Sequence, residues 1–383
     1  MSQFLRTGRK MQYNHQVYDY KWNRYIIEGA GVLLRRKTRN ILILIESCAK
    51  ISNMKKRPSL SKSRFIAGLQ CPLRLWYKCY DRNLAAPITP AQQAIFDSGH
   101  EVGRLATRCY PGGILIEEDY LHAADAVKTT AAAVKKPGVP SIYEAAFSHD
   151  DVLIRADILE RPTGESWNLV EVKSSSSVKD VYYWDVAIQY YVLQGVGLKI
   201  NRAGILHLNN QYVYDGNGPD LESLFYFSDM TDQVAARQRE ISLKLKEMKE
   251  MLAGGTAPEI VPSRHCKKPV PCEFWDHCTE KLPEFWVYGL SGIREDRLLE
   301  LMESGIFDIR DVPGSFPLTD LQQRIKTCVI NRQEYISPFL SGELNDVTFP
   351  VHFLDFETVS SAVPRYSGTR PYQAVPFQWS DHI

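Results

Sequence analysis

The chain has 383 residues, of which 44% are hydrophobic and 24% are charged. These proportions are ordinary for a folded protein and exclude a mainly disordered, collagen-like or coiled-coil chain. The longest apolar runs, such as Ile41 to Ile45, are much shorter than the roughly 18–20 residues of a membrane-spanning helix. No apolar stretch follows a basic segment near the start, so we expect a cytoplasmic protein with no membrane contact.

The formal net charge of +1 is unevenly distributed, because residues 1–60 carry +10 and the remainder carries −9. Nucleic-acid-binding proteins are often basic, so the bulk charge does not indicate that function. Eight cysteines are too dilute for a disulfide scaffold. In a reducing compartment, clustered cysteines bind metal ions or iron–sulfur clusters more often than they form disulfide bridges.

The first predicted helix begins near Ser61 or Ser63, either of which can serve as its N-cap. Two more helices are predicted over 90–108 and 121–136. The residues before Met54 are basic and show no clear period. We therefore expect the folded chain to begin at Met54.

Beyond these helices the hydrophobic period changes from helical to alternating. The expected elements are strands over 143–147, 152–159 and 167–172, a helix over 181–194, a strand over 205–208 that 211–214 extends or follows as a further strand, and a helix over 231–252. This order indicates a mixed α/β fold rather than a helical bundle or a β-sandwich.

The second and third predicted strands can place Asp157, Glu171 and Lys173 together. Neighbouring carboxylates repel unless a cation joins them. Mg²⁺ and Mn²⁺ suit oxygen ligands, and such an ion can polarise a phosphodiester and activate water. A lysine beside the ion can orient that water. The alternative is an exposed strand face with an ordinary Glu–Lys pair, which is the commoner reading of a lone Glu-x-Lys.

Asp157, followed by Glu171-Val172-Lys173, resembles the signature of PD-(D/E)XK nucleases. Gly99-His100 and Gln189 are similar to the RecB-like branch, which includes CRISPR-associated exonucleases. From about Ser61 onward, the chain also resembles a bacterial domain family that joins a RecB-like nuclease to a DEDD/RNase H-like exonuclease. The segments that carry this likeness are Cys71-Pro72, Phe96 to Gly103, Pro111-Gly112-Gly113, Gln189-Tyr190-Tyr191 and His207 to Asn210.

This resemblance implies a restriction-endonuclease-like mixed sheet flanked by helices. It also implies metal-dependent hydrolysis of DNA, although the sequence does not distinguish DNA from RNA. Asp157, Glu171 and His100 would hold Mg²⁺ or Mn²⁺, and Lys173 would assist the attacking water. The alternative function is a catalytically silent nucleic-acid-binding or scaffold protein on the same fold, or a truncated product. The presence of Asp157, Glu171 and Lys173 together argues against silence.

In the RecB-like branch, the helix that carries the glutamine contacts DNA or orders the site. The resemblance therefore implies DNA contacts from Gln189 and Tyr191 on the helix over 181–194, or a role of this helix in ordering the site. The RecB-like branch usually has Gln-x-x-x-Tyr, whereas this chain has Leu193 at the tyrosine position. Tyr190 or Tyr191 would have to substitute for that tyrosine.

Cys266, Cys272 and Cys278 form a C-x5-C-x5-C run in a proline-containing loop. In RecB-like relatives, three such cysteines join one distant N-terminal cysteine around a [4Fe–4S] cluster, and Cys71 would supply that ligand. Four thiolates also suit Zn²⁺, and a third alternative is that the cysteines are merely structural. Cysteines expected to be ordinary thiols are Cys48, Cys79, Cys109 and Cys328.

The last hundred residues contain two further predicted parts. Ile293 to Pro313 resembles half of a helix-hairpin-helix, or is simply a helix closed by glycine. Asp355 and Glu357 resemble the first motif of DEDD exonucleases, and we expect them to be inert because Asp381 is the only later carboxylate side chain. The predicted domains are an extension outside the core (1–53), a RecB-like nuclease with the cysteine cluster (54–282), a helical module (283–345) and a truncated start of an exonuclease domain (346–383).

Overall fold

The computed structural model describes residues 58–162 and 164–383. The described residues all belong to one compact unit. The predictions for 1–53, for a start at Met54 and for Cys48 lie outside the described residues.

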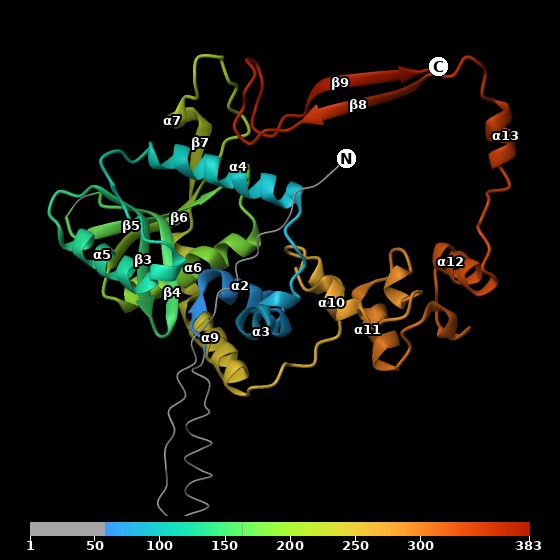
Figure 1. Ribbon diagram of the computed structural model, residues 1–383, viewed down its shortest axis with the longest axis horizontal. Coiled ribbons are helices and arrows are strands. Elements are labelled where there is room, and N and C mark those ends of the chain that lie inside the picture. The colour runs from blue at the N-terminus through green and yellow to red at the C-terminus, as the bar shows by residue number, and fades with distance from the viewer. Residues whose placement is uncertain (1–57, 163) are drawn as a thin grey trace, which may run out of the picture. The chain divides into compact units, whose positions relative to one another are not determined.

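Seven strands form one mixed sheet in the order β2-β3-β4-β5-β6-β7, with β1 paired to β4 (Figure 1). The strands are β1 (Leu60–Ser61), β2 (Ile114–Leu115), β3 (Ser141–His149), β4 (Val152–Glu160), β5 (Ser166–Lys173), β6 (Lys199–Leu208) and β7 (Phe225–Asp229). Strand β4 pairs antiparallel with both β3 and β5. Strands β5 and β6 pair in parallel, and helix α6 connects them along the chain. The prediction of a mixed α/β fold with a helix-flanked mixed sheet is confirmed.

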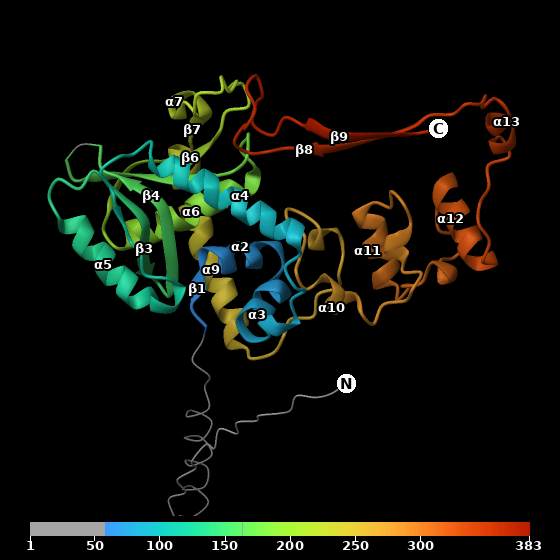
Figure 2. The same cartoon turned by 45° about the horizontal axis from the view of Figure 1, so that its top comes forward.

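Helices cover both faces of this sheet (Figure 2). Leu169 and Ile205 pack in one core with α2, α5, α6 and α9, whereas Val170 and Leu206 pack in a second core with α4. This division follows from the alternation of side chains along a strand. The helices of this region are α2 (Lys62–Gln70), α3 (Pro72–Tyr80), α4 (Pro90–Thr107), α5 (Ala123–Lys135), α6 (Asp180–Gly195), α7 (Leu221–Leu224), α8 (Thr231–Ala236) and α9 (Gln238–Ala253), with short 3₁₀ turns at Arg82–Leu84 and Tyr120–His122.

Helix α2 begins directly after Ser61, one of the two residues predicted as its N-cap. The Ser61 side chain accepts a hydrogen bond of 3.3 Å from the backbone amide of Arg64, so Ser61 rather than Ser63 is the N-cap. Lys62 is therefore the first helical residue, and its side chain starts beside the sheet.

Two predicted elements differ from the structure, and the sheet contains strands that the sequence pattern did not predict. The helix expected over 231–252 is divided at Arg237, whose guanidinium lies over the Tyr183 and Trp184 rings of α6. Residues 211–214 form no strand, because the backbone of Tyr214 pairs instead with the distant segment that contains Gly368 and Thr369. Strand β7 is absent from the predicted elements.

A third hydrophobic core lies between 275 and 329 and is built around Trp286, Leu298 and Leu301. Gly305, which follows the helix α11, has a φ of 76°, a conformation that glycine adopts without strain. The elements from here on are α10 (Trp275–Thr279), α11 (Glu295–Glu303), α12 (Asp320–Asn331), α13 (Leu340–Asn345), β8 (Phe353–Val359) and β9 (Val375–His382), with 3₁₀ turns at Arg264–Cys266, Val287–Gly289 and Ile309–Asp311.

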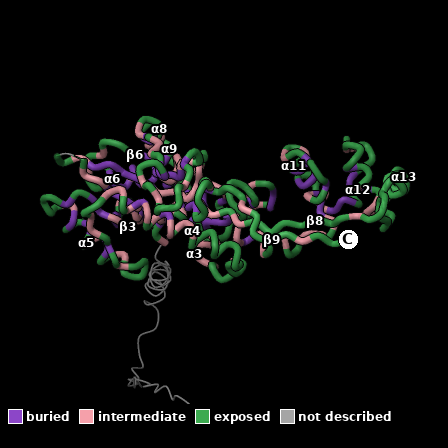
Figure 3. The backbone as a smooth tube through the Cα atoms, turned by 90° about the horizontal axis from the view of Figure 1, so that it is seen from above, coloured by how far each residue is buried: buried purple, intermediate pink, exposed green. Residues whose placement is uncertain are grey.

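Among the described residues, strands β8 and β9 pair only with each other, and most of their residues are exposed (Figure 3). The loop between them behaves differently, because it buries Ala362 and Val363 in the core beside α4. The C-terminal segment therefore contributes to the packing of the sheet domain.

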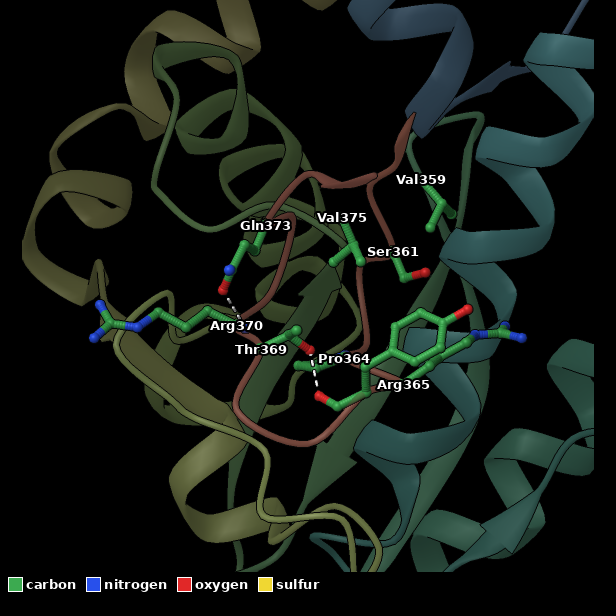
Figure 4. Close-up of a pocket in the computed structure, with 9 residues that line it drawn as sticks. Val359, Ser361, Pro364, Arg365, Thr369, Arg370, Gln373 and Val375 are labelled. Carbon is green, nitrogen blue, oxygen red and sulfur yellow. Dashed lines mark hydrogen bonds between the residues drawn. The ribbon is translucent and has the colours of Figure 1, made fainter. Parts of the chain in front are cut away.

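The same loop encloses a small cavity of about 10 Å³ (Figure 4). The loop is held by its own hydrogen bonds, including one of 3.0 Å from the Arg370 amide to the Gln373 side chain and one of 2.5 Å from Thr369 to the carbonyl of Tyr366. A cavity of this volume holds about one water molecule, so it is a packing feature rather than a substrate site.

Candidate active site and cysteine pocket

A cleft of about 1080 Å³ opens between helix α4 and the end of strand β5. It contains His100, Asp157, Glu171 and Lys173, which lie on three different elements and which the sequence predicts to form one site. His100 is exposed on α4. The other cleft residues are Gln93, Ile95, Phe96, Gly99, Gly103, Arg104, Thr107, Leu115, Tyr143, Glu144, Ile158, Val172 and Ser174.

The two carboxylates lie where the ladder between β4 and β5 ends. The last recorded pair is Ile158 with Val170, and continuing that register places Asp157 opposite Glu171. Instead of a ladder bond, the Val172 amide donates to Asp157 Oδ2 at 2.7 Å. The end of the pairing leaves both carboxylates at the cleft.

Glu171 is only 1% exposed and accepts four hydrogen bonds. Lys62 Nζ donates to both carboxylate oxygens, at 2.7 and 2.8 Å. Lys173 Nζ donates to Oε1 and Gln189 Nε2 to Oε2, each at 2.8 Å. A carboxylate has about four acceptor positions, so those of Glu171 are all in use.

The ammonium group of Lys173 is fixed by a second carboxylate. Its Nζ lies 2.7 Å from Asp185 Oδ2 and 5.2 Å from the centre of the Tyr182 ring. Burial alone would lower the pKa of Lys173, but the charges of Glu171 and Asp185 outweigh burial and raise it. Lys173 therefore remains a cation whose position is well defined.

The two carboxylates differ in their electrostatic environment. Burial and the charge of Glu171 raise the pKa of Asp157. Burial opposes ionisation of Glu171 as well, but there the charges of Lys62 and Lys173 prevail and lower its pKa. Asp157 is thus the carboxylate for which a further cation would favour ionisation most.

The predicted DNA-contacting residues of α6 lie in different places. Gln189 is fully buried beneath the site, where its amide nitrogen also donates to the carbonyl of Asp185 at 2.9 Å. Its Oε1 has no hydrogen-bond partner among the described residues. Tyr191 does not line the cleft; its hydroxyl donates to Asp150 at 3.1 Å, beside the turn between β3 and β4.

Two residues of the site, Lys62 and Asp185, were missed by the sequence reasoning. Asp185 precedes Gln189 by four residues, so the two share a helix face, and this spacing could have suggested it. Lys62 lies more than a hundred residues before Glu171, and no local spacing points to their contact.

The donor set is chemically suited to a hard divalent ion. Asp157 and Glu171 offer oxygen, and His100 offers an imidazole nitrogen, which Mn²⁺ also accepts. In the part of the chain that the structure describes, however, no three His, Cys, Asp or Glu side chains are already arranged to hold a metal ion. Lys62 and Lys173 supply the positive charge at Glu171 instead.

The four cysteines predicted to form one centre line a single small pocket of about 10 Å³. These residues are Cys71, Cys266, Cys272 and Cys278. Burial raises the pKa of Cys278 to about 11, and the three other thiols add to this effect. All seven described cysteines are free, and Cys79, Cys109 and Cys328 lie outside this pocket.

Polar side chains of α2 and α3 contact the loop that carries the cysteines. Gln70 donates to the carbonyls of His265 and Val270, each at 2.8 Å. Arg74 Nε lies 2.8 Å from Glu273, which Lys78 also contacts. Polar contacts therefore join the α2–α3 region to the cysteine loop.

Asp355 and Glu357 lie on the exposed strand β8. Asp355 Oδ1 accepts a 2.9 Å hydrogen bond from the neighbouring amide of Phe356. Neither residue lines the cleft around Lys173.

None of the described helices has the length and hydrophobicity that crossing a membrane requires.

Comparison with known proteins gives three results. Residues 352–383 match the model of a domain of unknown function, DUF2779. No curated protein matches the chain. Two solved structures are similar. The structure of SSO0001 has 15% sequence identity and a TM-score of 0.26, and the match covers 64% of this chain and 98% of that chain. The structure of the alkaline exonuclease LHK-Exo from Laribacter hongkongensis has 12% sequence identity and a TM-score of 0.23, and the match covers 51% of this chain and 90% of that chain. At these TM-scores the likeness carries no argument.

Proposed function

We propose that the chain is a metal-dependent nuclease that hydrolyses phosphodiester bonds of DNA in the cleft beside β5. The observation that supports this most strongly is that Asp157, Glu171 and Lys173 converge where β4 and β5 stop pairing. His100 faces the same cleft from α4, on a different element.

Each residue has a distinct role in this proposal. Asp157, Glu171 and His100 would hold Mg²⁺ or Mn²⁺, and the bound ion would supply polarisation of the phosphodiester and a lower pKa for water. Lys173 orients the attacking water through its ammonium group, and Asp185 keeps that group in position. Gln189 fixes the Glu171 carboxylate from below. Tyr191, placed away from the cleft, contributes no substrate contact in this scheme.

A catalytically silent binding protein on the same fold is the alternative function. The saturation of Glu171 by lysine and glutamine donors favours it, because no described group is arranged to hold a metal ion as it stands. The presence of Lys173 between two carboxylates favours the enzyme, since binding alone does not require that arrangement.

The experiment is a cleavage assay on linear duplex DNA, single-stranded DNA and RNA, with Mn²⁺, with Mg²⁺ and with EDTA. We expect DNA cleavage that EDTA abolishes and that Lys173→Ala reduces by about 10²-fold or more, with DNA binding nearly intact. Lys199→Ala is the matched control, because Lys199 is exposed at the opposite end of the β5–β6 pair. DNA binding without cleavage under all conditions would support the silent alternative.

We also propose that the four pocket cysteines hold a [4Fe–4S] cluster, with Zn²⁺ as the alternative. Their convergence from two distant segments supports a shared centre. As they stand in the described part of the chain, no three of these thiols are arranged to hold a metal ion, so either centre would require the cysteine side chains to move. The metal content of the purified protein distinguishes the two.

A further inference from the structure

Lys62 begins helix α2, and its ammonium group lies against the buried carboxylate of Glu171. Nζ is 2.7 Å from Oε1 and 2.8 Å from Oε2, and the lysine side chain is 23% exposed. Lys62 is not among the residues that line the cleft. It therefore reaches Glu171 from the α2 side, where part of its side chain is exposed.

Of the three donors to Glu171, Lys62 is the one least firmly held. Lys173 is anchored by Asp185 at 2.7 Å, and Gln189 is fully buried and tied to its own helix. In the described residues, Lys62 Nζ has no hydrogen-bond partner other than Glu171. A new ligand to Glu171 would thus replace Lys62 before it replaced either of the others.

We infer that Lys62 is an internal cation that competes with a divalent metal ion for Glu171. Binding of the ion from the cleft displaces the ammonium group toward solvent on the α2 side. This inference rests on the proposed function, because it concerns the same metal site. It explains how Glu171 is buried with its charge balanced, and it adds a residue that sets metal affinity without itself being a ligand.

The test measures Mn²⁺ binding to the full chain without nucleic acid, by calorimetry and by electron paramagnetic resonance. Lys62→Met removes the competing charge, so it should bind Mn²⁺ about tenfold more tightly than the wild type. Lys62→Arg can grip both carboxylate oxygens with a planar fork, so it should bind Mn²⁺ more weakly. Lys249→Met is the matched control, since it removes a 2.6 Å ion pair with Asp150 outside the cleft.

The rise in melting temperature on addition of Mn²⁺ is a second readout. It should be larger for Lys62→Met than for the wild type, because that variant leaves Glu171 less compensated before metal binds. Equal Mn²⁺ affinities and equal temperature rises in these two proteins would overturn the inference and leave the metal site standing. Absence of Mn²⁺ binding in every variant would overturn the proposed function together with the inference. If Lys62→Met does not fold, Lys62→Arg decides, and Mn²⁺ affinity equal to or above that of the wild type refutes the competition.

Discussion

Asp157 Oδ2 accepts a hydrogen bond of 2.7 Å from the backbone amide of Val172, the residue between Glu171 and Lys173. The Asp157 side chain on β4 thus takes the place of the backbone carbonyl that would otherwise accept from the Val172 amide of β5. It does so where the pairing of β4 with β5 ends. This bond serves the fold and the site together, because it fixes the separation of β4 and β5 while presenting a carboxylate to the cleft.

The Asp157–Val172 bond can be tested with two substitutions that both remove the charge. Asp157→Asn keeps an oxygen acceptor for the amide, whereas Asp157→Ala leaves the amide without one. We expect the free energy of unfolding of the Asp157→Asn protein to be about 1–2 kcal/mol higher than that of the Asp157→Ala protein. Urea denaturation in EDTA measures the difference, and an Asp157→Ala protein at least as stable as Asp157→Asn would refute the role of the bond.

Asp185 should act on catalysis only through Lys173. Asp185→Asn retains an oxygen near the ammonium group but loses the charge that holds it, so we expect the turnover number to fall roughly tenfold with KM for DNA unchanged. Asp180→Asn, at an exposed position in the first turn of the same helix, is the control. Steady-state kinetics separate these effects, and a rise in KM at constant turnover would contradict a positioning role.

The sequence predicts the parts of the site that depend on alternation within neighbouring strands. Asp157, Glu171 and Lys173 are brought together by a hairpin whose register local hydrophobicity already specifies. The contribution of Lys62 was not predictable in this way, because it depends on how α2 packs against the sheet. The failure of 211–214 to form a strand has a similar cause, since Tyr214 finds its backbone partners more than 150 residues later.

The loop between β8 and β9 should contribute to stability even though the flanking strands are exposed. Val363 is 7% exposed in the core beside α4, so Val363→Ser should lower the free energy of unfolding by about 1–3 kcal/mol. Phe377, which is 63% exposed on β9, provides the control. Phe377→Ser should change the free energy of unfolding by less than about 0.5 kcal/mol. If urea denaturation gives the same small change for both, the loop is not part of the core.

Cys71 should tie the beginning of the domain to the cysteine loop through a shared metal centre. The span from Cys71 to Cys266 is 195 residues, and a bound centre that closes so long a loop constrains the unfolded chain strongly. Cys71→Ser should therefore lose the metal and melt at a lower temperature, whereas Cys328→Ser should retain both properties, because Cys328 lies outside the pocket. Metal analysis of anaerobically purified protein should find about four irons per chain and a brown colour for a cluster, or one zinc and no colour for the alternative. A Cys71→Ser protein with full metal content would exclude Cys71 as a ligand and leave the polar contacts of Gln70 and Arg74 to explain why the two segments meet.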